Sequence, residues 1–260
     1  YRWPTIGLSV DDIKNASHED IKSFFAQHYA VNNLILCVSG HIEFEKAVAL
    51  TEKWFGDFAP ANIPVRNLPQ EPVQTEQRFM SVKREVPQNV LTMMYHMCGR
   101  CDADYQVCDM LSDVLSNGMS SRFYRNVLVK SGLFTELDAS VSGTYDPGLF
   151  IVRARLADGV SFDKAKDAID AELADFVSNG ATAYEIEKCA NKYESTRLFD
   201  MITYEKKGVK LCQYELLGDA ADINKEVGKY RCITQDRLMN VAKNLLNPDN
   251  CSILYYGPDA

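Results

Sequence analysis

The first apolar positions of the chain follow the period of an α-helix. Residues three and four apart share a helical face, and such a stripe begins soon after Ser17: Ile21, Phe24, Phe25 and His28. Ser17 and Asp20 stand at the two positions of a capping box, in which each side chain bonds the backbone N–H of the other residue. This segment therefore predicts an amphipathic helix that begins at Ser17.

Two further elements follow in quick succession. Residues 33–39 form a continuous apolar run, which predicts a buried strand, and a stripe from Ala47 to Trp54 predicts a helix that ends at Gly56. Helix, strand and helix supply too few strands for a sheet that buries its own face. The opening residues also contain neither an initiator Met nor a signal-peptide core, so we expect the chain to be a fragment of a longer protein.

A proline-rich stretch without periodicity separates these elements from the rest of the chain. It contains Pro60, Pro64, Pro69 and Pro72. Such a composition is typical of a semi-rigid linker. We therefore expect a first segment at residues 1–58, a linker at 59–73 and a domain at 74–260.

The expected domain at 74–260 mixes strands with helices. Alternating residues predict strands at 78–86, 89–98, 136–142, 149–156 and 252–256. Helical periodicity and capping residues predict helices at 105–115, from Ser120 or Ser121 to about 130, from Ser161 to Gly180, from Thr182 to about 198, at 206–217 and at 236–246. This order predicts an α+β fold, with a mostly antiparallel sheet and helices packed on one face.

Composition excludes several classes of function. A formal net charge of −8 argues against nucleic acid as a partner, because phosphate binding requires clustered Lys and Arg. The chain has no apolar run of about 20 residues, the length needed to span a membrane. Its eight cysteines lie within apolar runs of a chain that needs no disulfide framework, which favours reduced thiols and a cytoplasmic location.

No complete set of metal ligands is recognisable. His18-Glu19 lacks the second histidine of His-x-x-Glu-His, so we interpret His18 as a residue of a first helical turn. His41-x-Glu43 with Cys98-x-x-Cys101 imitates a zinc deaminase pattern, but Met97 replaces its proline and the cysteines follow a predicted strand.

The cysteines at 98, 101 and 108 leave three readings open. They could form a redox pair or three-quarters of a structural zinc site. Because a fourth ligand at matching spacing is missing, we favour thiols without a shared chemical role.

The segment Asn117-Gly118-Met119-Ser120-Ser121-Arg122 offers the most suggestive chemistry. Two hydroxyls, free N–H groups and a guanidinium at a helix start could hold a carboxylate or a peptide carbonyl. The simpler interpretation is that a serine caps the helix while Arg122 pairs with a surface acid. From the residues alone, the chain has no credible catalytic set.

Short motifs in a fixed order resemble the M16 (pitrilysin/insulinase-like) zinc metallopeptidases along nearly the whole chain. The matching pieces are Tyr1-Arg2-Trp3-Pro4-Thr5-Ile6-Gly7, the helix start at Ser17–Ile21, His28-Tyr29, Asn32-Asn33, Val38-Ser39-Gly40, Trp54-Phe55-Gly56, Leu111–Leu115, Ser120–Tyr124, Asp146–Phe150 and Tyr256-Gly257-Pro258.

This resemblance implies a peptidase built from two related α+β domains. Residues 1–58 would end the first, catalytic-type domain and residues 74–260 would form the second. The zinc ligands and the catalytic Glu of the family lie before the stretch that matches Tyr1, so we expect no catalytic and no metal-binding residue in this chain, and zinc only in the parent protein.

The resemblance also implies a role for this segment in binding unfolded peptides. Ser121, Arg122 and Tyr124 are the substrate-binding candidates. Leu128 and Thr135 stand where the family commonly has an Arg and a Tyr that grip the peptide, so we expect a homodimer or a second M16-like subunit to supply them. The alternative is a non-catalytic M16-like scaffold subunit.

Overall fold

The computed structural model describes residues 6–65, 67–258 and 260, so Tyr1-Arg2-Trp3-Pro4-Thr5 of the first motif lies outside the described part. The chain divides into two compact units. The helical unit comprises the described residues up to Glu71 together with Thr203–Ala220, and the sheet unit comprises Pro72–Ile202 and Ala221–Ala260.

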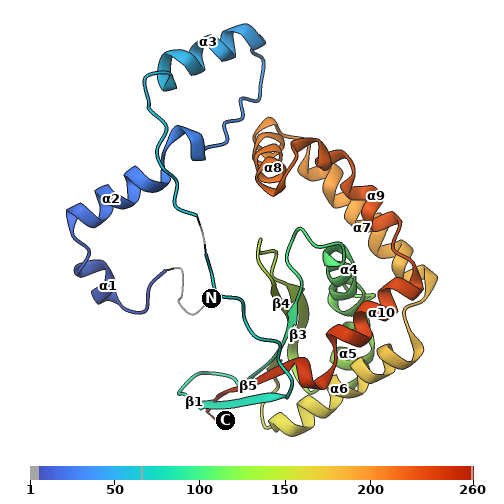
Figure 1. The fold of residues 1–260 in the computed structure, drawn as a ribbon. Coiled ribbons are helices and arrows are strands. Elements are labelled where there is room, and N and C mark those ends of the chain that lie inside the picture. The colour runs from blue at the N-terminus through green and yellow to red at the C-terminus, as the bar shows by residue number, and fades with distance from the viewer. Residues whose placement is uncertain (1–5, 66, 259) are drawn as a thin grey trace. The chain divides into compact units, whose positions relative to one another are not determined.

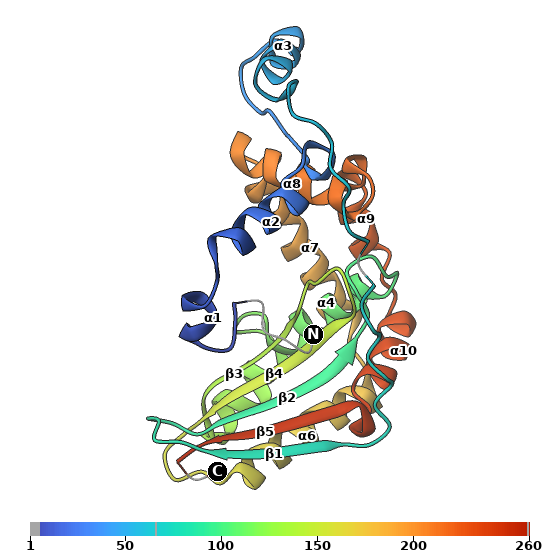
Figure 2. The same cartoon turned by 60° about the vertical axis from the view of Figure 1, so that its left-hand side comes forward.

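A five-stranded sheet organises the sheet unit (Figures 1 and 2). Its strands lie in the order β1 (Arg78–Lys83), β5 (Cys251–Gly257), β2 (Val90–Met97), β4 (Gly148–Leu156) and β3 (Phe134–Val141). β1 and β5 are parallel, and the other neighbouring pairs are antiparallel. The last strand of the chain therefore separates the two strands that flank Pro87.

Each strand turns alternate side chains to opposite faces of the sheet, as its period of two requires. One row across β3, β4, β2 and β5 is buried and apolar: Ala139, Val152, Met93 and Ile253. The next row, on the other face, mixes polar and apolar side chains: Asp138, Arg153, Thr92, Leu254 and Met80. We call this second side the open sheet face.

Helices cover one face of the sheet (Figure 1). α4 (Tyr105–Ser116), α6 (Phe162–Asn179) and α10 (Gln235–Leu245) contact the strands. α7 (Ala183–Asp200) and α9 (Glu226–Arg231) contact α4 from outside. The shorter elements are η2 (Phe123–Leu128), α5 (Val129–Ser131), η3 (Ala220–Asn224) and η4 (Pro248–Asn250).

The helical unit contains no strand within its described residues. Its elements are α1 (Val10–Lys14), α2 (His18–His28), η1 (Val31–Asn33), α3 (Phe44–Phe55) and α8 (Tyr204–Leu217). α1, α2 and α3 bury none of their residues. Their apolar stripes therefore lack a core within this unit.

Most of the expected elements are confirmed. α2 has the capping box of Ser17 and Asp20, α3 ends at Gly56, and α7 has the capping box of Thr182 and Glu185. The expected α+β class, with a mostly antiparallel sheet and helices on one face, is also confirmed. The division into independent domains at 1–58 and 74–260 stays a prediction.

Two expectations are wrong. Residues 33–39 form the end of η1 and an irregular segment rather than a strand, because an extended segment becomes a strand only where a neighbour bonds its backbone. The helix that begins at Arg122 is largely a π-helix, and the Ser121 hydroxyl before it has no hydrogen-bond partner among the described residues, so it does not cap the helix. None of the helices in the described ranges is long and apolar enough to cross a membrane.

Candidate functional site

The candidate segment joins α4 to the first strand of the β3–β4 hairpin. α4 ends at Asn117, and Gly118 follows with φ +90°, a conformation that favours glycine. After Arg122 the chain winds through the π-helix η2 into α5, which Gly132 ends in the left-handed conformation. π-Helical turns are rare and are frequently found at functional sites.

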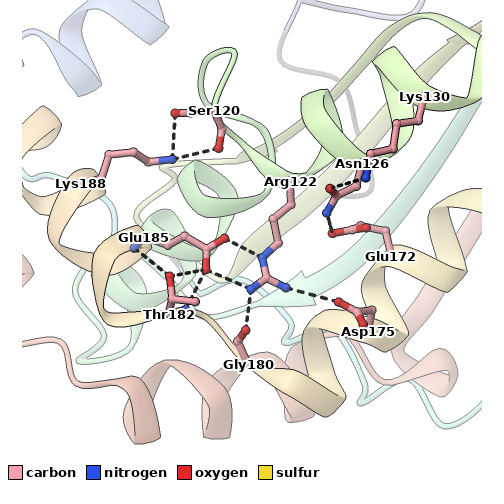
Figure 3. A network of polar contacts seen from close by, with 10 residues as sticks. All are labelled: Ser120, Arg122, Asn126, Lys130, Glu172, Asp175, Gly180, Thr182, Glu185 and Lys188. Carbon is pink, nitrogen blue, oxygen red and sulfur yellow. Dashed lines mark hydrogen bonds and ion pairs between the residues drawn. The ribbon is translucent and has the colours of Figure 1, made fainter.

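Arg122 points away from solvent into a set of oxygen acceptors (Figure 3). Its Nε donates to Glu185 Oε1 at 2.8 Å and its Nη2 donates to Glu185 Oε2 at 3.0 Å. Nη2 also donates to the Gly180 carbonyl at 2.6 Å, and Nη1 lies 3.6 Å from Asp175 Oδ2. With the guanidinium 4.9 Å from the centre of the Phe176 ring, Arg122 fastens η2 to the turn between α6 and α7.

The Glu185 carboxylate serves two purposes in this arrangement. It accepts hydrogen bonds from the Thr182 N–H at 2.7 Å and hydroxyl at 2.9 Å, which completes the α7 capping box. Burial acts to raise the pKa of Glu185, but the hydrogen bonds from Arg122 and Thr182 outweigh it and lower the pKa to about 2. The bond to Glu185 likewise raises the pKa of Arg122. The pair is therefore ionised at neutral pH.

Ser121 and Tyr124 have different surroundings from Arg122. Ser121 is fully buried, and its hydroxyl has no hydrogen-bond partner among the described residues. Tyr124 is half-buried on the first turn of η2. The structure therefore does not direct the three side chains to one exposed point, and their role as peptide contacts stays a prediction.

Lysines of α7 hold the loop that precedes η2. Lys188 Nζ donates to the Ser120 hydroxyl at 3.1 Å and to its carbonyl at 3.3 Å. Lys192 donates to Asn117, which in turn donates to Asp113. Asn117 and Ser120 of this loop are thus held by side chains of α4 and α7.

A second contact fastens η2 to α6 about one turn beyond Arg122. Asn126 Nδ2 donates to Glu172 Oε1 at 3.0 Å (Figure 3). Burial raises the pKa of Glu172, and the bond from Asn126 opposes that effect. Together, the contacts of Arg122 and Asn126 hold η2 in a fixed position. Neither contact pairs a nucleophile with a base.

The sequence identified Arg122 but not its partners. The spacing of Thr182 and Glu185 predicts the capping box, and nothing in that spacing indicates that Glu185 also binds an arginine 63 residues away in sequence. Asp175 and the Gly180 carbonyl contribute only because α6 ends beside η2.

The described residues do not fit a zinc site. No group of three or more His, Cys, Asp or Glu side chains in the described ranges could hold a metal ion. The deaminase pattern also lacks its local structure, since Glu43 is the residue before α3 and Cys98 directly follows β2, ahead of the α4 start.

The cysteines at 98, 101 and 108 differ in their exposure to solvent. Cys98 is half-buried, Cys101 is exposed and Cys108 is buried. A hydrogen bond between Cys98 and Cys108 lowers the pKa of Cys98. Two of the three thiols therefore meet, and together with Cys101 they do not form a recognisable ligand set.

Comparisons with known proteins agree on one family. Residues 15–193 match the family described as "Peptidase M16 inactive domain". A relative named as an uncharacterized zinc protease of Streptomyces coelicolor is 24% identical over 249 residues, which cover 94% of this chain and 54% of that protein. The chain spans little more than half the length of the curated relatives that it matches almost end to end.

Solved structures show the same fold. The crystal structure of a protease from Helicobacter pylori matches with a TM-score of 0.87 at 20% identity, covering 96% of this chain and 61% of that one. The M16 inactive domain from Pseudomonas fluorescens matches with a TM-score of 0.83 at 17% identity, covering 96% and 60%.

Proposed function

Because this chain belongs to the family of M16 peptidase inactive domains, we propose that it is the non-catalytic C-terminal portion of a zinc metalloendopeptidase that hydrolyses unfolded peptides. The observation that carries this proposal is the family match over 15–193 in a chain without a His-x-x-Glu-His motif. The zinc and the groups that activate water would be bound by another part of the parent protein.

We assign this portion the role of wall and peptide contact. The open sheet face mixes charged side chains such as Asp138 and Arg153 with apolar ones such as Leu254. A surface of this kind suits polypeptides of varied sequence, because it offers both hydrogen-bonding and apolar contacts. Tyr124 adds a half-buried aromatic ring on η2, while Arg122 keeps η2 in position.

Assembly and location are further parts of the proposal. A homodimer or a second M16-like subunit would supply the peptide-gripping pair that Leu128 and Thr135 do not provide. The eight cysteines lie within apolar runs of a chain that needs no disulfide framework, so we propose a reducing compartment, the cytoplasm.

Kinetics of the parent protein on a quenched fluorescent peptide test the proposed roles. We expect Tyr124→Ala to raise KM with little change in kcat, because it removes binding surface away from the zinc. Arg122→Ala should raise KM and also lower the free energy of unfolding by about 3 kcal/mol, since it leaves a largely buried carboxylate unpaired.

Arg125→Ala is the matched control, because Arg125 lies on the same π-helix and is exposed. It should change neither KM nor stability. If both test variants fold and keep the wild-type KM, η2 is not a peptide contact. A parent protein that binds no zinc and cleaves no peptide would instead support the scaffold alternative.

A further inference from the structure

Helix α8 lies along an extended segment that is distant in sequence. The Ser39 hydroxyl donates to the Tyr204 carbonyl at 2.7 Å, and the Cys212 thiol donates to the Ile35 carbonyl at 3.9 Å. Both contacts lie within the helical unit. The segment from Ile35 to Ser39 therefore runs antiparallel to two turns of α8.

Cys37 occupies the middle of this contact. A Cβ atom at Gly208 would lie 3.5 Å from Cys37 Sγ, so Cys37 lies against the helix at that position. Gly208 and Cys212 are four residues apart, and residues with this spacing are neighbours on one helical face. The next side chain along the face from Gly208 is therefore a second thiol.

The two thiols meet. A hydrogen bond joins Cys37 to Cys212, and both side chains are half-buried rather than enclosed. A disulfide requires Cα atoms about 4.4–6.8 Å apart with converging Cβ atoms. Close approach of the segment to a glycine-containing helical face favours that geometry.

We propose that Cys37 and Cys212 form a reversible disulfide when they meet glutathione disulfide, and that this bond fastens α8 to the segment 34–39. It would join positions 175 residues apart in sequence. The helices α1, α2 and α3 bury no residues. The bond would therefore act on a part of the chain with little other constraint.

The reaction is an exchange in two steps. One cysteine thiolate attacks a sulfur of glutathione disulfide, which forms a mixed disulfide and releases one glutathione thiolate. The second cysteine thiolate then attacks the protein sulfur of that mixed disulfide and releases the other glutathione. Two protein thiols are oxidised, one glutathione disulfide is reduced to two thiols, and excess thiol reverses both steps.

Burial, together with the neighbouring Cys212, raises the pKa of Cys37. The thiolate is the attacking species, so this effect limits the reaction near neutrality. Cross-linking should consequently become faster as the pH rises.

Peptide mapping of the folded chain tests the proposal. The protein is incubated with glutathione disulfide under native conditions, alkylated and digested without reduction. We expect a linked pair of peptides that contain Cys37 and Cys212, with a mass about 2 Da below their sum. The pair should disappear after reduction, and amide exchange in α8 should slow after oxidation. Mapping also separates this bond from one between Cys98 and Cys108.

Single variants supply the controls. In the Cys37→Ser variant, glutathione disulfide should leave Cys212 as a glutathione adduct, because the second protein thiol is missing. Cys232→Ser removes an exposed cysteine of the sheet unit and should leave the cross-link unchanged. The proposal is overturned if Cys37 and Cys212 of the folded wild-type chain are recovered only as separate adducts or alkylated thiols.

Discussion

Glu185 shows how one side chain can serve both local and distant structure. Its position three residues after Thr182 completes the α7 capping box, which is a local interaction. Its two oxygens also accept hydrogen bonds from Nε and Nη2 of Arg122, and this bidentate contact ties α7 to η2. Because both side chains are mostly buried, with 12% and 17% of their surfaces exposed, solvent screens this pair less than a surface pair.

This pairing predicts a pH dependence of stability. The folded-state pKa of Glu185 is about 2, below its ordinary 4.5, so its contribution is complete above about 4.5 and is lost as the pH falls toward 2. In urea unfolding across that range, wild type should lose stability relative to Glu185→Gln. A constant difference between the two proteins would show that the ionised carboxylate contributes nothing.

Glu172 makes the comparison with the variant necessary. Burial raises its pKa, so it has the opposite effect on stability: its ionisation opposes folding, and protonation relieves that cost. Both proteins contain Glu172, so its effect cancels when the free energy of unfolding of Glu185→Gln is subtracted from that of wild type.

The sheet shows the same contrast between local pattern and distant contacts at the scale of elements. Alternation along β4 determines that Phe150, Val152 and Ala154 share one face. Alternation does not determine which strand becomes the neighbour, and the chain places β5 between β1 and β2. Register then aligns Phe150 with Tyr95, whose ring meets it edge-on at 6.4 Å.

Substitutions on opposite faces of β4 test this sidedness. Phe150→Ala should lower the free energy of unfolding by about 3–5 kcal/mol, because Phe150 is fully buried and its loss leaves a cavity. Arg153→Ala, on the open sheet face, should change it by less than about 0.5 kcal/mol. Equal losses in chemical denaturation would mean that both faces are packed.

At the scale of the whole molecule, burial is unevenly distributed. The large core belongs almost entirely to the sheet unit, where α4 alone buries nine of its residues, from Tyr105 to Leu115. α2 and α3 have clear apolar stripes, yet Phe24, Phe25 and Trp54 remain exposed. These stripes are suited to pack against further polypeptide, which the parent protein would provide under the proposed function.

Amide hydrogen exchange of this chain should report that difference directly. We expect α2 and α3 to exchange through local opening of low free energy, and α4 to exchange only at a cost near that of global unfolding. Mass spectrometry of peptides from α2, α3 and α4 measures their deuterium uptake over time. Comparable protection in α3 and α4 would contradict the uneven distribution of burial.

The sequence by itself determined the local features: the capping boxes at Ser17 and Thr182, and the order of helices and strands that predicts the α+β class. Each depends on contacts between residues a few positions apart, which spacing reveals. The tertiary structure decided the irregular path of residues 33–39, the π-helix at Phe123–Leu128 and the engagement of Arg122 by Glu185. A strand needs a partner and an ion pair needs its counterion, and in both cases the deciding group lies far away in sequence.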